Sequence, residues 1–187
     1  MMSAYDFVHL VLFASNGAIQ GRTKLQKTVY FVGALTGTLP SLGYRAHYYG
    51  PYSGEVSAAV NELRGLGFLR QTSTNSGEFD PQGFEVARYD YKLTSEGRQI
   101  AQEKAELYPH EWKAIKNAVG LLRSMTVQDY VRLSIAAKML FILKEMGRAS
   151  LDELLEVTPK FGWNVTSNQL AEAGSFLEAL GLVESRN

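Results

Sequence analysis

Residues 53–69 read SGEVSAAVNELRGLGFL, and this stretch decides the fold. Ser53 is a favourable N-cap for the helix that follows it. Four apolar residues then recur at the spacing of one buried helix face: Val56, Ala59, Val60 and Leu63. Gly65 and Gly67 bracket the end of the helix, as glycines commonly do. The sequence therefore predicts a helix over 54–66 that leads directly into a β-strand.

The flanking sequence predicts a hairpin after this helix and two helices before it. Strands are expected over 68–72 and 84–93, joined by a polar loop over 73–83 rich in Ser, Asn, Gly and Pro. Earlier helices are expected over 4–14 and from Thr23, with a short strand over 44–49 between the second and third helices. The order of three helices and a hairpin is that of a winged helix, whose third helix is presented to DNA.

Pro109 separates this unit from a second half of the chain. We expect a mainly α fold with a small β-hairpin (α+β): a winged helix-turn-helix domain over 1–108 and a C-terminal helical subdomain over 109–187. The later segments are predicted as helices over 111–122, 127–146, 151–157 and 167–180, with a possible strand over 181–184. The expected N-caps are Ser3, Ser53, Thr94, Thr126, Ser150 and either Thr166 or Ser167.

The last helix ends in LEALGLV (177–183), which resembles LRGLGFL (63–69). One interpretation is that the C-terminal half is a second helix-turn-helix unit without a complete wing. The alternative is that any junction between a helix, a glycine and an apolar strand looks like this. The sequence leaves both open.

The composition excludes several classes of protein. The chain has 187 residues, with nineteen Lys and Arg against nineteen Asp and Glu, and no cysteine. Net zero charge argues against a bulk polyanion binder, and the lack of cysteine removes disulfides, thiolate metal sites and cysteine nucleophiles. No apolar run is long enough for a membrane span, and no basic segment and cleavage site frame a signal peptide. We expect a cytoplasmic protein.

The charges are nevertheless unevenly spread. No acidic residue lies between Asp6 and Glu55, a window that holds the four cations Arg22, Lys24, Lys27 and Arg45. From Lys144 to the C-terminus four basic residues face seven acidic ones. Such asymmetry indicates either an end of the molecule that faces a polyanion or chance clustering of solvated charges.

The start of the second helix is the first candidate binding site. Arg22, Lys24 and Lys27 are expected to project outward there, close to free backbone N–H groups, and this arrangement suits a phosphate. The alternative is an ordinary amphipathic helix with a basic rim.

The outward face of the third helix is the second candidate site. Its polar residues are Ser57, Asn61 and Arg64, of which Asn61 could contact adenine and Arg64 guanine in a major groove. Arg70 and Arg88 on the hairpin would add phosphate contacts. Two glutamates, Glu55 and Glu62, are expected to flank this face unfavourably, and small polar residues suit a protein partner equally well.

Other functional signals are weak. Ten tyrosines, several of them in residues 44–52, raise the possibility of stacking on single-stranded bases, although burial in the core explains them as well. The three histidines lie far apart, and no HExxH, GxSxG or P-loop pattern occurs. We therefore expect no enzyme, no metal site and no cofactor.

Two motifs carry a family resemblance. GRTKLQKTVYF (21–31) and YGPYS (49–53), followed by the LGFL junction, resemble the YwgA-like group of small prokaryotic proteins and, more loosely, the Panacea antitoxin domain. The resemblance covers about 5–101 and implies a prokaryotic winged-helix protein, while the Panacea relatives imply toxin neutralisation by protein contact. The matching motif positions are Thr23, Lys24, Leu25, Gln26, Lys27, Gly50 and Pro51.

Two of these motif positions have competing roles. Leu25 is expected in the core, and Gln26 and Lys27 could hold the Gly50–Pro51 turn through side-chain hydrogen bonds instead of binding phosphate. The leading hypothesis is a homodimeric winged-helix DNA-binding protein, a transcriptional regulator with double-stranded DNA as its partner. The alternative is a protein-interaction module of a toxin–antitoxin or phage-defence system that does not touch DNA.

Overall fold

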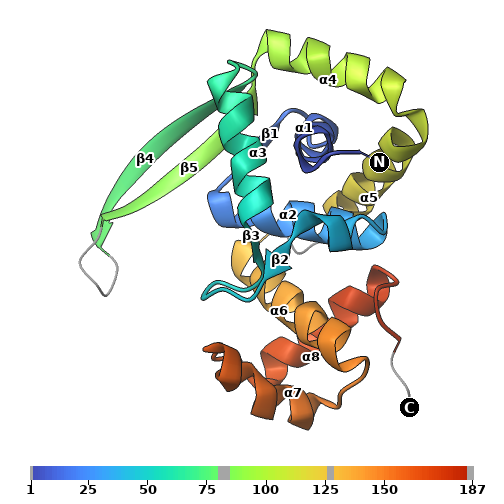
Figure 1. Cartoon of the computed structure of the whole chain (residues 1–187). Helices are drawn as coiled ribbons and strands as arrows, with labels where there is room; N and C mark the ends of the chain where they lie inside the picture. The colour runs from blue at the N-terminus through green and yellow to red at the C-terminus, as the bar shows by residue number, and fades with distance from the viewer. Residues whose placement is uncertain (1, 80–84, 126–128, 185–187) are drawn as a thin grey trace.

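The computed structural model describes residues 2–79, 85–125 and 129–184 and is mostly helical, with a small antiparallel sheet (Figure 1). The first half contains α1 (Ala4–Ala14), β1 (Ala18–Gln20), α2 (Arg22–Leu35), η1 (Leu39–Leu42), β2 (Tyr44–Arg45), β3 (Tyr52–Ser53), α3 (Gly54–Gly65), β4 (Leu69–Phe79), β5 (Glu85–Leu93) and α4 (Ser95–Leu107). The second half contains α5 (Pro109–Ser124), α6 (Tyr130–Met146), α7 (Leu151–Val157), η2 (Thr158–Phe161) and α8 (Ser167–Ala179). The predicted α+β composition is confirmed.

Side-chain caps set the helix starts where the sequence places them. Five predicted caps each accept a backbone N–H three residues further on: Ser3, Ser53, Thr94, Ser150 and Thr166. The last two form complete capping boxes, which satisfy a second free amide at each helix start. The predicted cap Thr126 lies outside the described residues, and Asp129 caps α6 from its described beginning at Tyr130.

The sheet is larger than the sequence predicts. Three strands pair antiparallel in the order β1-β5-β4, and β1, which was not predicted, adds Ile19 opposite Tyr91. The loop predicted from residue 73 is wrong as far as Phe79, because β4 continues to pair with β5 there. Backbone hydrogen bonds to β5 stabilise this polar segment as a strand. Hydrophobic periodicity could not predict it, because the segment has no alternating apolar pattern. Residues 80–83 of that loop lie outside the described part.

The predicted strand over 44–49 is also wrong in length. Only Tyr44–Arg45 is paired, with Ser53 and Tyr52 as partners, and residues 46–51 form the loop between them. Residues 181–184 do not form the predicted strand. Both α3 and α8 end in the same glycine turn, in which Phe68 N–H donates to Leu63 and Leu182 N–H donates to Leu177. Of these two helices, α3 is followed by a strand, which pairs with β5, whereas the described residues after α8 form no strand.

Two apolar cores meet at α2. The first core packs α1 against α2, α3 and α5, with Val8, Val29 and Ile115 fully or almost fully buried in it. The second core packs α6 and α8 around Trp163, and Tyr30 and Phe31 of α2 belong to it. Figure 1 shows α6, α7 and α8 on one side of α2 and the hairpin projecting from the other part of the molecule. The division at residue 108 stays a prediction, since α5 packs into the first core.

Candidate nucleic-acid interface

Gln26 ties α2 to the start of α3. Its side chain is buried, its Nε2 donates to the Ser53 carbonyl at 3.0 Å and its Oε1 accepts the Ser53 N–H at 3.1 Å. The same Nε2 lies 3.1 Å from Ser57 Oγ. The amide therefore satisfies both backbone groups of the residue that caps α3 and sets where α3 begins. The structural alternative named the Gly50–Pro51 turn as the partner of Gln26, whereas these bonds go to Ser53 and Ser57 just after that turn.

Lys27 is an internal residue, and the prediction that it projects outward is wrong. Its side chain is 2% exposed, and Nζ donates to the Pro51 carbonyl at 2.6 Å. Burial, and then the charge of Lys138, lower the pKa of Lys27 to about 7. The lysine holds the Gly50–Pro51 turn by this hydrogen bond, and its buried amine cannot contact a phosphate. Its position on the buried side of α2 follows from the packing of α6 on that helix.

Stability is expected to rise with pH because of Lys27. The pKa of Lys27 is about 7 in the folded chain and near the ordinary 10.5 when unfolded. Between these pH values the unfolded chain binds more protons than the folded chain. Raising the pH therefore removes a stabilisation of the unfolded chain. The free energy of unfolding should increase by about 1.4 kcal/mol per pH unit near pH 8–9. Urea denaturation at pH 7, 8 and 9 measures the slope. Lys27→Met should flatten it, and an unchanged slope in that variant would contradict the assignment.

A small hollow lies between α2, α3 and the base of the hairpin. Its volume is about 190 Å³, and its lining includes Arg22, Ser57, Asn61, Arg64 and Gln71 but no carboxylate. Four predicted site residues, Arg22, Ser57, Asn61 and Arg64, therefore meet in one place. Arg64 Nη1 donates to Asn61 Oδ1 at 3.3 Å, and the Arg22 guanidinium lies 4.4 Å from the centre of the Tyr89 ring. Gln71 was missed as a lining residue, and Tyr89 was missed as the partner of Arg22, because only the strand register places them.

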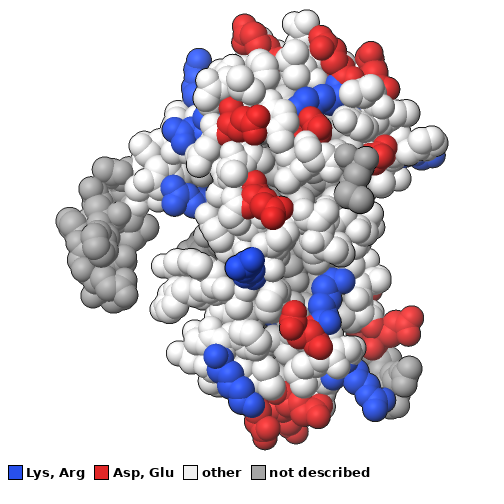
Figure 2. Space-filling model, viewed as in Figure 1, with Lys and Arg blue, Asp and Glu red and all other residues white. Residues whose placement is uncertain are grey.

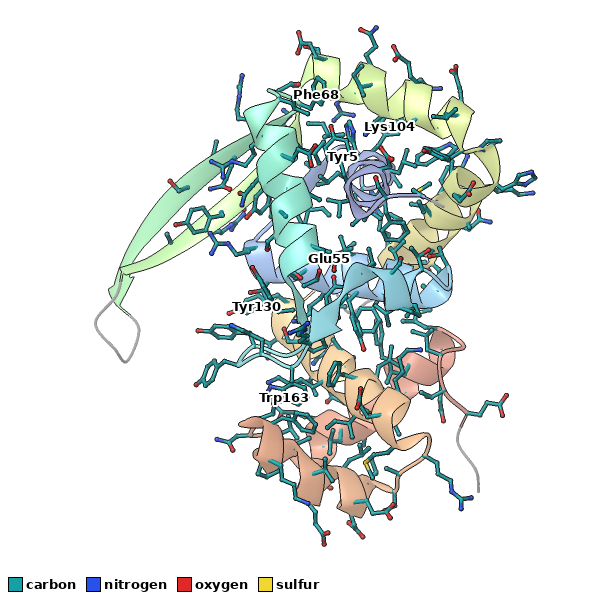
Figure 3. The ribbon with its side chains drawn as sticks, in the orientation of Figure 1. Tyr5, Glu55, Phe68, Lys104, Tyr130 and Trp163 are labelled. Atoms are coloured by element: carbon teal, nitrogen blue, oxygen red, sulfur yellow. The ribbon has the colours of Figure 1, made fainter. Side chains whose placement is uncertain are left out.

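Glu55 and Glu62 lie on the side of α3 that faces away from this hollow. The Glu55 carboxylate lies beside Gly43, and burial, followed by the charge of Glu62, raises the pKa of Tyr5. Figure 3 shows Glu55 on the side of α3 opposite the hairpin, and in Figure 2 the blue side chains at the hairpin base are separate from the red ones over α3. The expectation that both glutamates flank the polar face is therefore wrong. The helix α3 therefore carries Arg64 on one side and its two glutamates on the other.

The remaining candidates do not join the hollow. Lys24 lines a different recess, together with residues of α5. Arg70 pairs opposite Lys92 and Arg88 opposite Thr74, whereas Gln71 pairs opposite Tyr91. Because side chains alternate along a strand, Arg70 and Arg88 point to the other face of the ribbon from the hollow.

A carboxylate already lies at the start of α2, where the sequence predicted a phosphate. Asp90 forms an ion pair with Arg88 at 2.9 Å, and its Oδ1 accepts the Gly21 N–H at 3.1 Å. The pair neutralises the charge of Arg88, and Asp90 complements the positive end of the helix dipole. This end of α2 is therefore less suited to an external anion than the sequence predicted.

Two other kinds of feature are absent from the described residues. No cluster of three or more histidine, aspartate or glutamate side chains among them is placed to hold a metal ion. None of the helices in the described ranges combines the length and the apolar character needed to cross a membrane.

Comparison with known proteins gives one informative similarity. No known family model matches the chain. Over 86 residues the chain is 35% identical to a Bacillus subtilis (strain 168) protein named "Uncharacterized protein YwgA". The aligned part is 46% of this chain and 47% of that protein, so the chain spans about half the length of this relative. The similarity supports the YwgA-like resemblance and does not extend to the Panacea domain.

Proposed function

We propose that the chain is a winged-helix DNA-binding protein that regulates transcription. The observation that carries the proposal is the separation of charge on α3. Its hairpin-facing side contributes Asn61 and Arg64 to a hollow without carboxylates, while Glu55 and Glu62 lie on the opposite side. A polar, cationic helix face beside a hairpin is what insertion into a major groove requires.

The order of elements supports the winged-helix assignment. The helices α1, α2 and α3 precede the β4–β5 hairpin, and the strand β1 lies between α1 and α2 in the chain. In the sheet, β1 pairs with β5 on the side opposite β4. In this arrangement α3 is the recognition helix and the hairpin is the wing. The similarity of the last helix turn to that of α3 is consistent with a second, wingless helix-turn-helix in α6–α8.

The residues of the hollow have distinct proposed roles. Asn61 and Arg64 contact base edges, and Arg22 and Gln71 contact the phosphate backbone beside them. A two-fold dimer would place two such helices on neighbouring half-sites. The proposal requires no catalytic residue and no cofactor, and it places the protein in the cytoplasm of a prokaryote.

Reversing the charge of the recognition helix should weaken DNA binding. Arg64→Glu is expected to lower affinity for double-stranded DNA about tenfold or more, because it removes a base contact and introduces repulsion from phosphates. Fluorescence anisotropy with labelled genomic-fragment duplexes at low salt measures the change. Lys113→Glu, which makes the same charge change at an exposed position of α5, is the matched control and should change affinity less than about twofold. Absence of binding by the wild-type chain at low salt would refute the proposal.

The second candidate is a protein-interaction module of a toxin–antitoxin or phage-defence system. The specific observation in its favour is the loss of two candidate cations, since Lys27 is buried and Asp90 neutralises Arg88. A partner protein requires no basic surface. Purification of the chain in a stoichiometric complex with one protein, free of nucleic acid and without binding to duplexes, would favour this function.

A further inference from the structure

Residues 46–50 present two tyrosines to solvent. Tyr48 and Tyr49 are 70% and 60% exposed, and their ring centres lie 5.0 Å apart at 89°. Tyrosine rings usually cover apolar surface and leave only the hydroxyl in water. Here most of each side chain lies in solvent and the two rings pack edge to face against each other, so burial in the core does not explain these residues.

The loop that carries them is held in place from both halves of the chain. The His47 carbonyl accepts hydrogen bonds from Trp163 Nε1 at 2.7 Å and from the Gly50 N–H at 2.8 Å. Trp163 is fully buried, and Figure 3 shows it at the C-terminal helices beneath this loop. Lys27 holds the next residue, Pro51, through its carbonyl. The loop backbone is therefore ordered before any ligand binds, which lowers the entropic cost of binding.

The tyrosines continue the surface of the hollow described above. The His47 ring lies 5.2 Å from that of Tyr52 and 6.4 Å from that of Tyr49, and Tyr52 itself lines the hollow. Arg45 pairs directly opposite Tyr52, so the two side chains share one face of the β2–β3 ribbon. A track of cations and aromatic rings thus runs from Arg64 through Tyr52 and His47 to Tyr49 and Tyr48.

We propose that Tyr48 and Tyr49 form a stacking platform for the unpaired bases of a single-stranded segment that continues from the DNA bound at α3. The inference rests on the proposed DNA-binding function and extends it to a junction of double and single strands. In a duplex the base faces are hidden by neighbouring bases, whereas an unpaired base offers a free face to an aromatic ring. Arginine beside aromatic rings is a combination that single-strand binding sites use. The track is continuous through Tyr52 with the hollow at α3, and this continuity selects nucleic acid as its occupant.

The test uses the full chain and three labelled DNAs: a blunt duplex, the same duplex with a single-stranded thymidine overhang, and a thymidine oligonucleotide. Tyr48→Ala/Tyr49→Ala should weaken binding to the overhang duplex about tenfold or more and leave binding to the blunt duplex unchanged. Tyr48→Phe/Tyr49→Phe keeps both rings and should bind like the wild type. Leu107→Ala, which also removes an exposed apolar side chain, is the control for unspecific effects.

The outcomes separate this inference from the proposed function. Loss of overhang binding in the alanine variant with rescue by phenylalanine supports it. Equal overhang affinity in the wild type and the alanine variant overturns it and leaves duplex binding intact. If the chain binds no duplex, the proposed function fails, and the thymidine oligonucleotide then decides the inference. A tenfold loss of oligonucleotide affinity in the alanine variant supports the inference. Absence of oligonucleotide binding by the wild type overturns it. A protein that co-purifies only with the wild type, with oligonucleotide affinity unchanged, overturns it in favour of a protein partner.

Discussion

Gln26→Leu is expected to lower the free energy of unfolding by about 2–5 kcal/mol. The variant removes hydrogen bonds to both the N–H and the carbonyl of Ser53, a residue with no exposed surface, and each buried group left unpaired costs about 1–3 kcal/mol. Leucine cannot replace either bond. Because Ser53 is the cap of α3, the change also releases the helix that we propose to enter DNA.

Urea denaturation monitored by circular dichroism measures the loss. Gln102→Leu is the matched control, since it makes the same substitution at an exposed position of α4, where the amide donates to the exposed Glu106. It should change stability by less than about 0.5 kcal/mol. Similar losses in both variants would show that Gln26 has no special role in holding α3.

Gly97→Ala should destabilise the fold by about 3 kcal/mol or more. A Cβ atom at Gly97 would overlap the Phe68 carbonyl oxygen and lie 2.8 Å from the Phe68 carbonyl carbon. That carbonyl is fixed because it accepts the Thr94 N–H at 3.0 Å, and the Gly97 carbonyl in turn lies 2.7 Å from His9 Nε2. Backbone atoms on both sides would have to move, which places the cost at the upper end of overpacking effects.

The control for this variant is Gly120→Ala in α5, where a Cβ atom would meet no neighbouring atom. Both substitutions remove the same conformational freedom from the unfolded chain, so that contribution cancels between them. Gly120→Ala should raise stability by about 0.5–1 kcal/mol. Chemical denaturation of the two variants side by side measures the difference, and equal stabilities would contradict the close approach of α4 to the start of β4.

Much of the local structure could be predicted from short-range patterns. Ser53 and Thr94 cap α3 and α4 as their positions indicate, because an N-cap depends on a side chain and an amide three residues apart. Gly97 carries no such local signal, because glycine in the first turn of a helix is only mildly unfavourable by itself. Its actual role depends on Phe68, which approaches it from the hairpin.

The candidate site could be predicted only in part. Arg22, Ser57, Asn61 and Arg64 were identified from one helix face and one basic helix start, and they do line one hollow. The burial of Lys27 depends on the elements that cover α2, and a lysine on an amphipathic helix is expected to be exposed unless that partner is known. Gln71 and Tyr89 required the strand register, which sequence periodicity does not contain.

The sequence by itself therefore determined the α+β class, the order of the helices and hairpin, and the places where the helices begin. These depend on neighbours within about four residues of each other along the chain. Only the tertiary structure decided which charges are free: it buried Lys27, paired Arg88 with Asp90 and directed Glu55 and Glu62 away from Arg64. It also anchored His47 to Trp163, far along the chain, and so exposed Tyr48 and Tyr49. The physical reason is that burial and electrostatic pairing depend on distances in space, which arise only when both cores have packed.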